Sequence, residues 1–87
     1  MWFLYMVKCA DGSLYTGITT NLKRRLKEHN HSSRGAKYTK TRRPVELAYH
    51  KACDSRRDAI FQERALKKKT RQHKLALVRK QKEGIIT

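Results

Sequence analysis

The sequence predicts an α+β fold, with a small three-stranded antiparallel sheet flanked by helices in the order ββαβαα. Two apolar runs, residues 2–9 and 13–18, are separated by an Asp-Gly turn signal, which is typical of a β-hairpin. A third run, residues 45–51, alternates apolar and polar side chains, and most of the rest has helical periodicity. The length of 87 residues favours one domain over 1–87, with 70–87 as a basic C-terminal helix and short tail.

The predicted hairpin carries two tyrosines whose orientation depends on the length of its turn. With a two-residue loop, Tyr5 and Tyr15 would point to opposite faces of the sheet, because side chains alternate along a strand. With a three-residue loop and Gly12 in the left-handed conformation, Tyr5 would oppose Gly17 and both tyrosines would share a face. Gly17 would then leave open space beside Tyr5 for a substrate backbone. Joint action of the tyrosines requires the longer loop, and simple packing of two tyrosines is the alternative.

Asn21 is the predicted N-cap of a helix that runs to about His29. At the helical period, Arg25 and His29 fall beside the leucines of the buried arc, whereas Arg24 points to solvent. Because Arg25 and His29 lie four residues apart, their side chains can reach one target, and a guanidinium grips a phosphate well. An arginine that covers its leucines and a purely structural histidine are the alternatives.

The second half of the chain begins with a long basic connection, residues 30–44, in which a short helix is expected near 35–39. Ser55 with Asp58 three residues later is a capping pattern, which predicts a helix to about Lys69. A last helix, about 71–83, is expected to place Leu75, Leu77 and Val78 on its buried side.

In the predicted helix that begins at Ser55 and runs to about Lys69, Glu63 falls on the apolar arc, between Ala59 and Leu66. A carboxylate on such an arc is costly to bury without a partner. One carboxylate with several waters is an ordinary way to hold Mg²⁺ beside a phosphate. An ion pair with Lys67 is the structural alternative.

The charge balance indicates a polyanionic partner. The chain has 22 Lys and Arg against 7 Asp and Glu, a net charge of +15. Such an excess favours nucleic acid, whereas a membrane surface usually selects a strongly amphipathic helix. The short apolar start and two cysteines without metal-ligand spacing indicate a soluble protein of the cytoplasm. The expected nucleic-acid contacts are Gly17, Arg24, Arg34, Lys37, Tyr38, Arg42, Arg43, Lys67 and Lys68.

Taken together, these residues resemble the GIY-YIG nuclease family over almost the whole chain, from about residue 2 to 82. The first motif tyrosine corresponds to Tyr5, and the second motif corresponds to Tyr15-Thr16-Gly17. The family's arginine, its following His or Tyr, and its metal-binding glutamate correspond to Arg25, His29 and Glu63. The chain differs in having Phe3, Leu4 and Thr16 within the two motifs, Ile18 where some members have lysine, and no asparagine after Glu63.

The resemblance implies a GIY-YIG-type fold and metal-dependent hydrolysis of DNA, with Mg²⁺ or Mn²⁺ held by Glu63. It implies catalytic roles for Tyr5, Tyr15, Arg25, His29 and Glu63, with either tyrosine as the base. A structure-selective enzyme of DNA repair or recombination is expected, with RNA as an alternative substrate and a protein partner or a homodimer as a source of further specificity. The alternatives are a non-catalytic nucleic-acid-binding module with this fold and an adaptor whose basic tail binds an acidic protein.

Overall fold

A computed structural model describes residues 1–84 of the chain, so the predicted tail beyond Gly84 lies outside the described residues. The elements are β1 (Trp2–Lys8), β2 (Leu14–Thr19), α1 (Leu22–His31), α2 (Lys37–Lys40), β3 (Glu46–Cys53), α3 (Arg56–Lys67) and α4 (Arg71–Lys82). This order matches the predicted ββαβαα series, with the short α2 inside the basic connection. None of the helices in the described part is long and apolar enough to cross a membrane.

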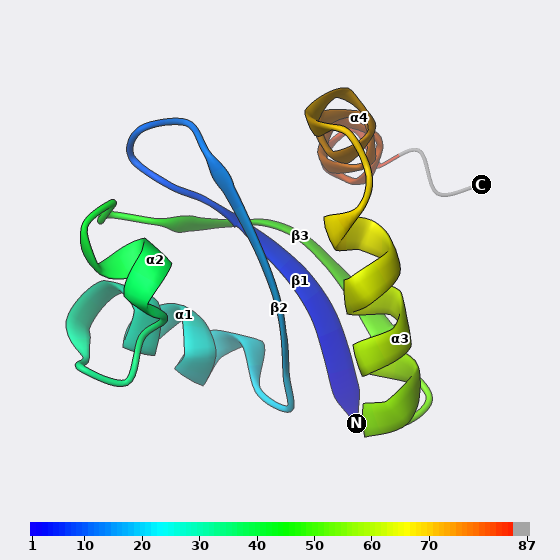
Figure 1. Ribbon diagram of the computed structural model, residues 1–87, viewed down its shortest axis with the longest axis horizontal. Helices are drawn as coiled ribbons and strands as arrows, with labels where there is room; N and C mark the ends of the chain where they lie inside the picture. Colours follow the sequence, from blue (N-terminus) through cyan, green and yellow to red (C-terminus); the bar gives the residue numbers. More distant parts are fainter. Residues whose placement is uncertain (85–87) are drawn as a thin grey trace.

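The three strands form one antiparallel sheet in the order β2-β1-β3, so β1 is the central strand (Figure 1). The hairpin between β1 and β2 has the longer loop. The Cys9 N–H donates to the Ser13 carbonyl at 2.8 Å, and Gly12 has a φ of +86°. Tyr5 therefore pairs with Gly17 and Tyr15 pairs with Val7, which is the register that joint action of the tyrosines requires.

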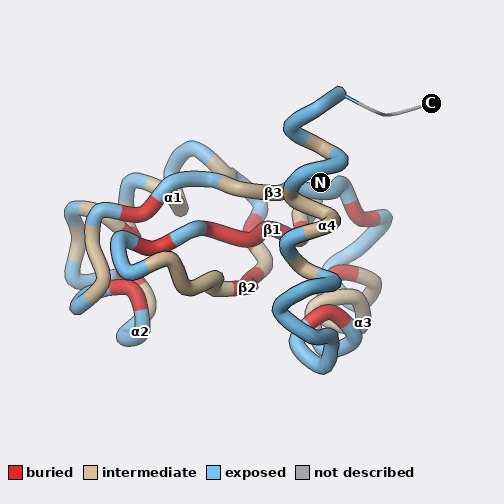
Figure 2. The backbone as a smooth tube through the Cα atoms, turned by 90° about the horizontal axis from the view of Figure 1, so that it is seen from above, coloured by how far each residue is buried: buried red, intermediate tan, exposed pale blue. Residues whose placement is uncertain are grey.

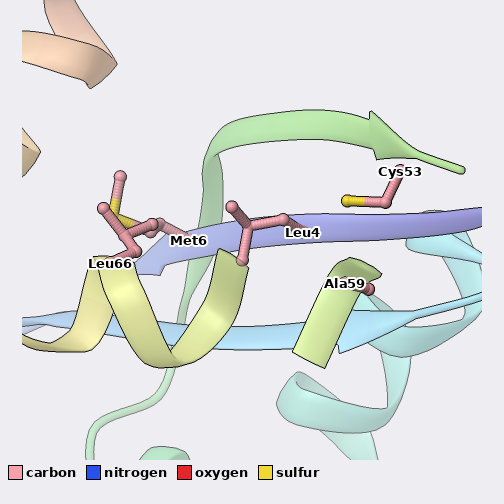
Figure 3. Packing of buried hydrophobic residues seen from close by; sticks show 5 residues of the cluster. All are labelled: Leu4, Met6, Cys53, Ala59 and Leu66. Carbon is pink, nitrogen blue, oxygen red and sulfur yellow. The ribbon is translucent and has the colours of Figure 1, made fainter. Parts of the chain in front are cut away.

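Each face of the sheet is covered by a different pair of helices. Helices α1 and α2 lie on one side of the strands and α3 and α4 on the other, which Figures 1 and 2 show from two directions. Successive residues of β1 alternate between these faces. Tyr5 and Val7 belong to the cluster on the α1 side, whereas Leu4 and Met6 belong to the cluster on the α3 side. The α3-side cluster is Leu4, Met6, Cys53, Ala59 and Leu66 (Figure 3).

Side-chain caps begin the helices where the sequence predicts them. The Asn21 side chain accepts from the Arg24 N–H, and the Ser55 hydroxyl accepts from the Asp58 N–H. The helix ends differ by two residues from expectation, since α1 continues to His31 and α3 ends at Lys67. Such differences arise because the last turns of helices carry weak local signals.

Helix α4 is the least buried element of the fold. Leu77 and Val78 pack against the α3-side cluster as expected, but Leu75 is 38% exposed, so its predicted burial is wrong. The reason is that α4 contacts the sheet mainly through residues 77–81. The Gln81 side chain accepts from the His50 N–H at 2.9 Å and donates to the His50 carbonyl at 2.7 Å. Gln81 thus pairs both the backbone N–H and the carbonyl that His50 presents on the outer edge of β3.

Candidate active site

Three polar side chains from three elements form a buried chain on the α1 side of the sheet. The Tyr5 hydroxyl lies 2.7 Å from Nε2 of His29, and Nδ1 of His29 lies 3.0 Å from the Thr39 hydroxyl. That hydroxyl donates to the Ala36 carbonyl at 2.8 Å. The Ala36 N–H also donates to Nδ1 at 3.4 Å, so both ring nitrogens of His29 have partners and Nε2 is hydrogen-bonded to the Tyr5 hydroxyl. His29 and Thr39 are fully buried, and Tyr5 is 2% exposed.

Burial sets the protonation states of this chain. Burial raises the pKa of Tyr5 to about 12, and the nearby Arg25 guanidinium only partly offsets that effect. Burial also lowers the pKa of His29 to about 4, and the positive charge of Arg25 adds to the shift. At neutral pH the tyrosine and the histidine are therefore both uncharged. The imidazole holds the Tyr5 hydroxyl by a hydrogen bond, and it is too deeply buried to reach a phosphate itself.

Tyr15 lies beside this chain and is only half-buried. Its ring meets the His29 ring edge-on, with centroids 5.4 Å apart, and stacks on Tyr38 with centroids 5.9 Å apart. The Arg42 guanidinium covers the Tyr38 ring at 3.9 Å, donates to Asp11 at 3.1 Å and so connects α2 with the hairpin turn. Aromatic and cation–π contacts of this kind fix the position of a ring. Tyr15 is consequently held from both sides and is the more accessible of the two motif tyrosines.

Arg25 is held at the edge of the same site. Its Nη1 donates to the Glu28 carboxylate and to the Arg34 carbonyl, both at 2.9 Å, and its side chain is 24% exposed. The pKa of Glu28 lies below its usual range because Arg25 donates to it. Arg24 has a 57% exposed side chain, so the predicted difference between the adjacent arginines is confirmed.

Glu63 lies on α3, and its charge is near enough to influence Tyr5. Its side chain is 20% exposed, and Lys67 Nζ lies 3.4 Å from its carboxylate. No group of three His, Cys, Asp or Glu side chains that could hold a metal occurs within residues 1–84. One partly exposed carboxylate fits only the kind of Mg²⁺ or Mn²⁺ site in which water and substrate oxygens supply the other ligands.

Two expectations about individual residues disagree with the structure. A Cβ on Gly17 would lie 2.7 Å from the Tyr5 hydroxyl, so the space beside Tyr5 is filled by its own ring and is not open to a substrate backbone. Arg43 donates to the carbonyls of His29 and Ser32 at the end of α1. Its guanidinium is used as a helix cap, which does not agree with a free phosphate contact. The sequence pattern showed the charge of Arg43 but not the helix end that faces it.

The other predicted contacts lie on the outside of the molecule. Arg24, Arg34, Lys37, Tyr38, Lys67 and Lys68 are exposed, and Arg42 is half-buried. Sequence reasoning missed Thr39, Glu28 and Gly35. A Cβ on Gly35 would lie 2.6 Å from the Glu28 carbonyl, so this glycine permits the basic connection to cross α1 closely. Only the spacing of Gly35 and Thr39 within the polar connection could have indicated these contacts.

Comparison with known proteins identifies the family of the chain. The fold and the paired tyrosines are those of a small nuclease domain, and the family model described as the GIY-YIG catalytic domain matches residues 1–76. The chain therefore belongs to the GIY-YIG family. A UPF0213 protein of Desulfotalea psychrophila is 51% identical over 83 residues, which cover 95% of this chain and 76% of the relative. A UPF0213 protein of Streptococcus agalactiae is 48% identical over 80 residues, which cover 92% of this chain and 90% of the relative.

A solved structure is similar as well. The solution NMR structure of the UPF0213 protein BH0048 from Bacillus halodurans is 42% identical, with a TM-score of 0.56. The match covers 90% of this chain and 83% of that chain. Both the family resemblance and the predicted fold class are thus confirmed.

Proposed function

We propose that this protein hydrolyses phosphodiester bonds of DNA with the help of Mg²⁺ or Mn²⁺. The observation that carries the proposal is the convergence of Tyr5, Tyr15, His29 and Arg25 on one site, with the charge of Glu63 beside them. Binding alone would not need a buried tyrosine–histidine pair next to a restrained arginine. Membership of a nuclease domain family supports the same conclusion.

The two tyrosines differ in burial, which suggests that they have different roles. Tyr15 is the half-exposed tyrosine, so we assign to it the contact with the attacking water. Tyr5 is enclosed and hydrogen-bonded to His29, so it is a positioning residue that fixes the strand pair and the ring of His29. An ordinary tyrosine pKa of about 10 makes phenol a weak base, and nearby cations must favour its phenolate for proton abstraction.

Arg25 is suited to the charge that develops on the phosphoryl oxygens. A guanidinium has five donors, and Arg25 uses Nη1 for both Glu28 and the Arg34 carbonyl. Another N–H group contacts the Tyr5 hydroxyl, and the donors that remain can bind a phosphate from a guanidinium already held in place, which is how preorganised donors stabilise a transition state. Glu63 would hold the divalent cation, which when bound polarises the phosphate and stabilises the leaving oxygen.

The exposed basic residues support contact with a nucleic-acid backbone. Arg34 and Lys37 lie near Tyr38 on the α1 side, and Lys67 and Lys68 lie at the end of α3 next to Glu63. Contacts of this kind neutralise phosphates without reading the base sequence. We therefore expect weak sequence preference and selection by the shape of the DNA, as for branched substrates in repair or recombination.

A cleavage assay tests the proposal directly. Labelled single-stranded, duplex and branched DNA and an RNA strand are incubated with the protein and Mg²⁺, Mn²⁺ or EDTA. Arg25→Ala and Glu63→Gln should each reduce the rate by at least about 100-fold, the usual effect of losing a group that stabilises transition-state charge. Glu46→Gln, on the edge strand β3, is the matched control for loss of one carboxylate. Salt-sensitive binding without metal-dependent cleavage on every substrate would instead support the non-catalytic binding module.

A further inference from the structure

Lys67 differs from the other cations at the end of α3. Three lysines follow each other there, Lys67, Lys68 and Lys69, and all three are exposed. Lys67 is the one that lies four residues after Glu63, so its side chain reaches back along the helix to that carboxylate. Its Nζ is 3.4 Å from Oε2 of Glu63. A cation that belongs to the protein is thus already at the carboxylate that we assign to the divalent ion.

The exposure of the pair shows that it can open. The Glu63 side chain is 20% exposed, whereas the Lys67 side chain is 52% exposed. The carboxylate is therefore fixed on the half-buried side of α3, between the buried Ala59 and Leu66, while the ammonium end is free to move into solvent. Exposed ion pairs of this kind contribute little to folding, so stability does not account well for its presence.

The surroundings of the pair favour a second partner for Lys67. A divalent ion at Glu63 would repel the ammonium and remove its carboxylate partner. A phosphate bound beside Glu63 and Arg25 is the nearest anion that the proposed reaction brings to this place. Lys67 would then gain a phosphate oxygen where it loses a carboxylate oxygen, so its charge is never left without a counter-ion.

We propose that Lys67 is an exchangeable counter-ion of Glu63, which couples binding of the divalent cation to binding of the nucleic acid. In the free protein its ammonium neutralises the Glu63 carboxylate. When both ligands are bound, the same ammonium contacts a backbone phosphate. The divalent cation displaces Lys67 from Glu63, and the phosphate draws Lys67 away from Glu63. Each ligand therefore weakens a contact that opposes binding of the other, and the two affinities must change by the same factor. This inference rests on the proposed function, because it assumes a divalent ion at Glu63.

Direct measurement of Mn²⁺ binding tests the coupling without any cleavage. Electron paramagnetic resonance counts free Mn²⁺ in titrations of the protein alone and with a short phosphorothioate DNA oligonucleotide. The wild-type protein should bind Mn²⁺ at least about fivefold more tightly when the oligonucleotide is present, the low end of ordinary coupling between two sites. Lys67→Met should bind Mn²⁺ about twofold more tightly without DNA, since a weak competing pair is lost. Its gain with DNA should be smaller than that of the wild-type protein, because only the contribution of the substrate oxygens remains, and Lys67→Arg should restore the full gain.

Lys68→Met is the matched control, because it removes the same charge from the adjacent residue, the C-cap of α3. It should weaken DNA binding slightly and leave the coupling unchanged. Equal coupling in Lys67→Met and Lys68→Met would overturn the role of Lys67 while the proposed function stands. Absence of Mn²⁺ binding that depends on Glu63, measured with Glu63→Gln, would overturn both. The two failures are therefore distinguishable.

Discussion

The two faces of the sheet bury their side chains in different ways. On the α3 side, Leu4 and Met6 pack into an apolar cluster that needs no specific partners. On the α1 side, Tyr5, His29 and Thr39 are just as deeply buried, but each is fixed by a directed hydrogen bond. Apolar packing tolerates small displacements, whereas a buried polar chain requires every partner in place. Both faces bury apolar side chains, but only the α1 side adds polar groups held in precise positions.

Removal of Met6 should have the largest effect on folding. Met6 is fully buried on the apolar face, so Met6→Ala should reduce the free energy of unfolding by about 2–5 kcal/mol. Chemical denaturation measures this loss. Leu75→Ala is the control, since the 38% exposed Leu75 should contribute within about 0.5 kcal/mol. Equal losses for the two variants would contradict the assignment of the stabilising core to this face.

The pH dependence of stability should come largely from the polar face. An unfolded histidine binds a proton below about pH 6.5, whereas buried His29 binds one only near pH 4. The unfolding free energy should therefore fall as the pH drops from 6.5 to 4, by about 3 kcal/mol from this residue. His29→Gln should lack that part of the slope. Parallel pH profiles for the two proteins would show that His29 is not held uncharged.

Gly17→Ala should damage the polar face selectively. The new Cβ would lie 2.7 Å from the Tyr5 hydroxyl and 2.9 Å from Cζ, so the ring must move away from His29. We expect a loss of about 1–3 kcal/mol together with loss of cleavage. In a Tyr5→Leu background the clash is absent, so the same substitution should cost little. Additive effects in this double-mutant cycle would refute the contact.

Gln81→Ala should have the smallest effect on the free energy of unfolding, and it tests the hydrogen bonds at the outer edge of β3. It removes both hydrogen bonds to His50, which should cost about 0.5–1.5 kcal/mol. Hydrogen exchange of the His50 amide should become faster, while the amides of β1 keep their protection. The exposed Lys80→Ala serves as the control. An unchanged exchange rate at His50 would show that Gln81 does not complete the edge.

Local signals in the sequence were sufficient for most of the fold. The capping residues Asn21 and Ser55 and the alternation of β1 have strong local causes, and the structure agrees with them. The hairpin register depended on one turn residue, Gly12, and both registers were compatible with the pattern. The sequence placed Leu75 incorrectly because helical periodicity does not show how far a neighbouring strand extends.

The candidate site was only partly predictable for the same reason. Local patterns in the sequence predicted the positions of Tyr15 and Arg25. They also predicted that Glu63 lies on the apolar arc of its helix. Thr39 and Arg43 act through partners 10 and 14 residues away, across a connection without periodicity. Their roles depend on how that connection crosses α1, which no pattern in the sequence describes.

The alternation of side chains along β1 determines what happens to a molecule whose strands pair out of register. Neighbouring residues of one strand supply the apolar cluster and the tyrosine of the site, so a pairing error of one residue would exchange the two sets. Such a molecule would place Tyr5 in the apolar α3-side cluster and Met6 on the α1 side, so the hydrogen bond between Tyr5 and His29 would be lost and the fold destabilised. The same packing that keeps the molecule folded therefore also keeps Tyr5 and Tyr15 on one face of the sheet.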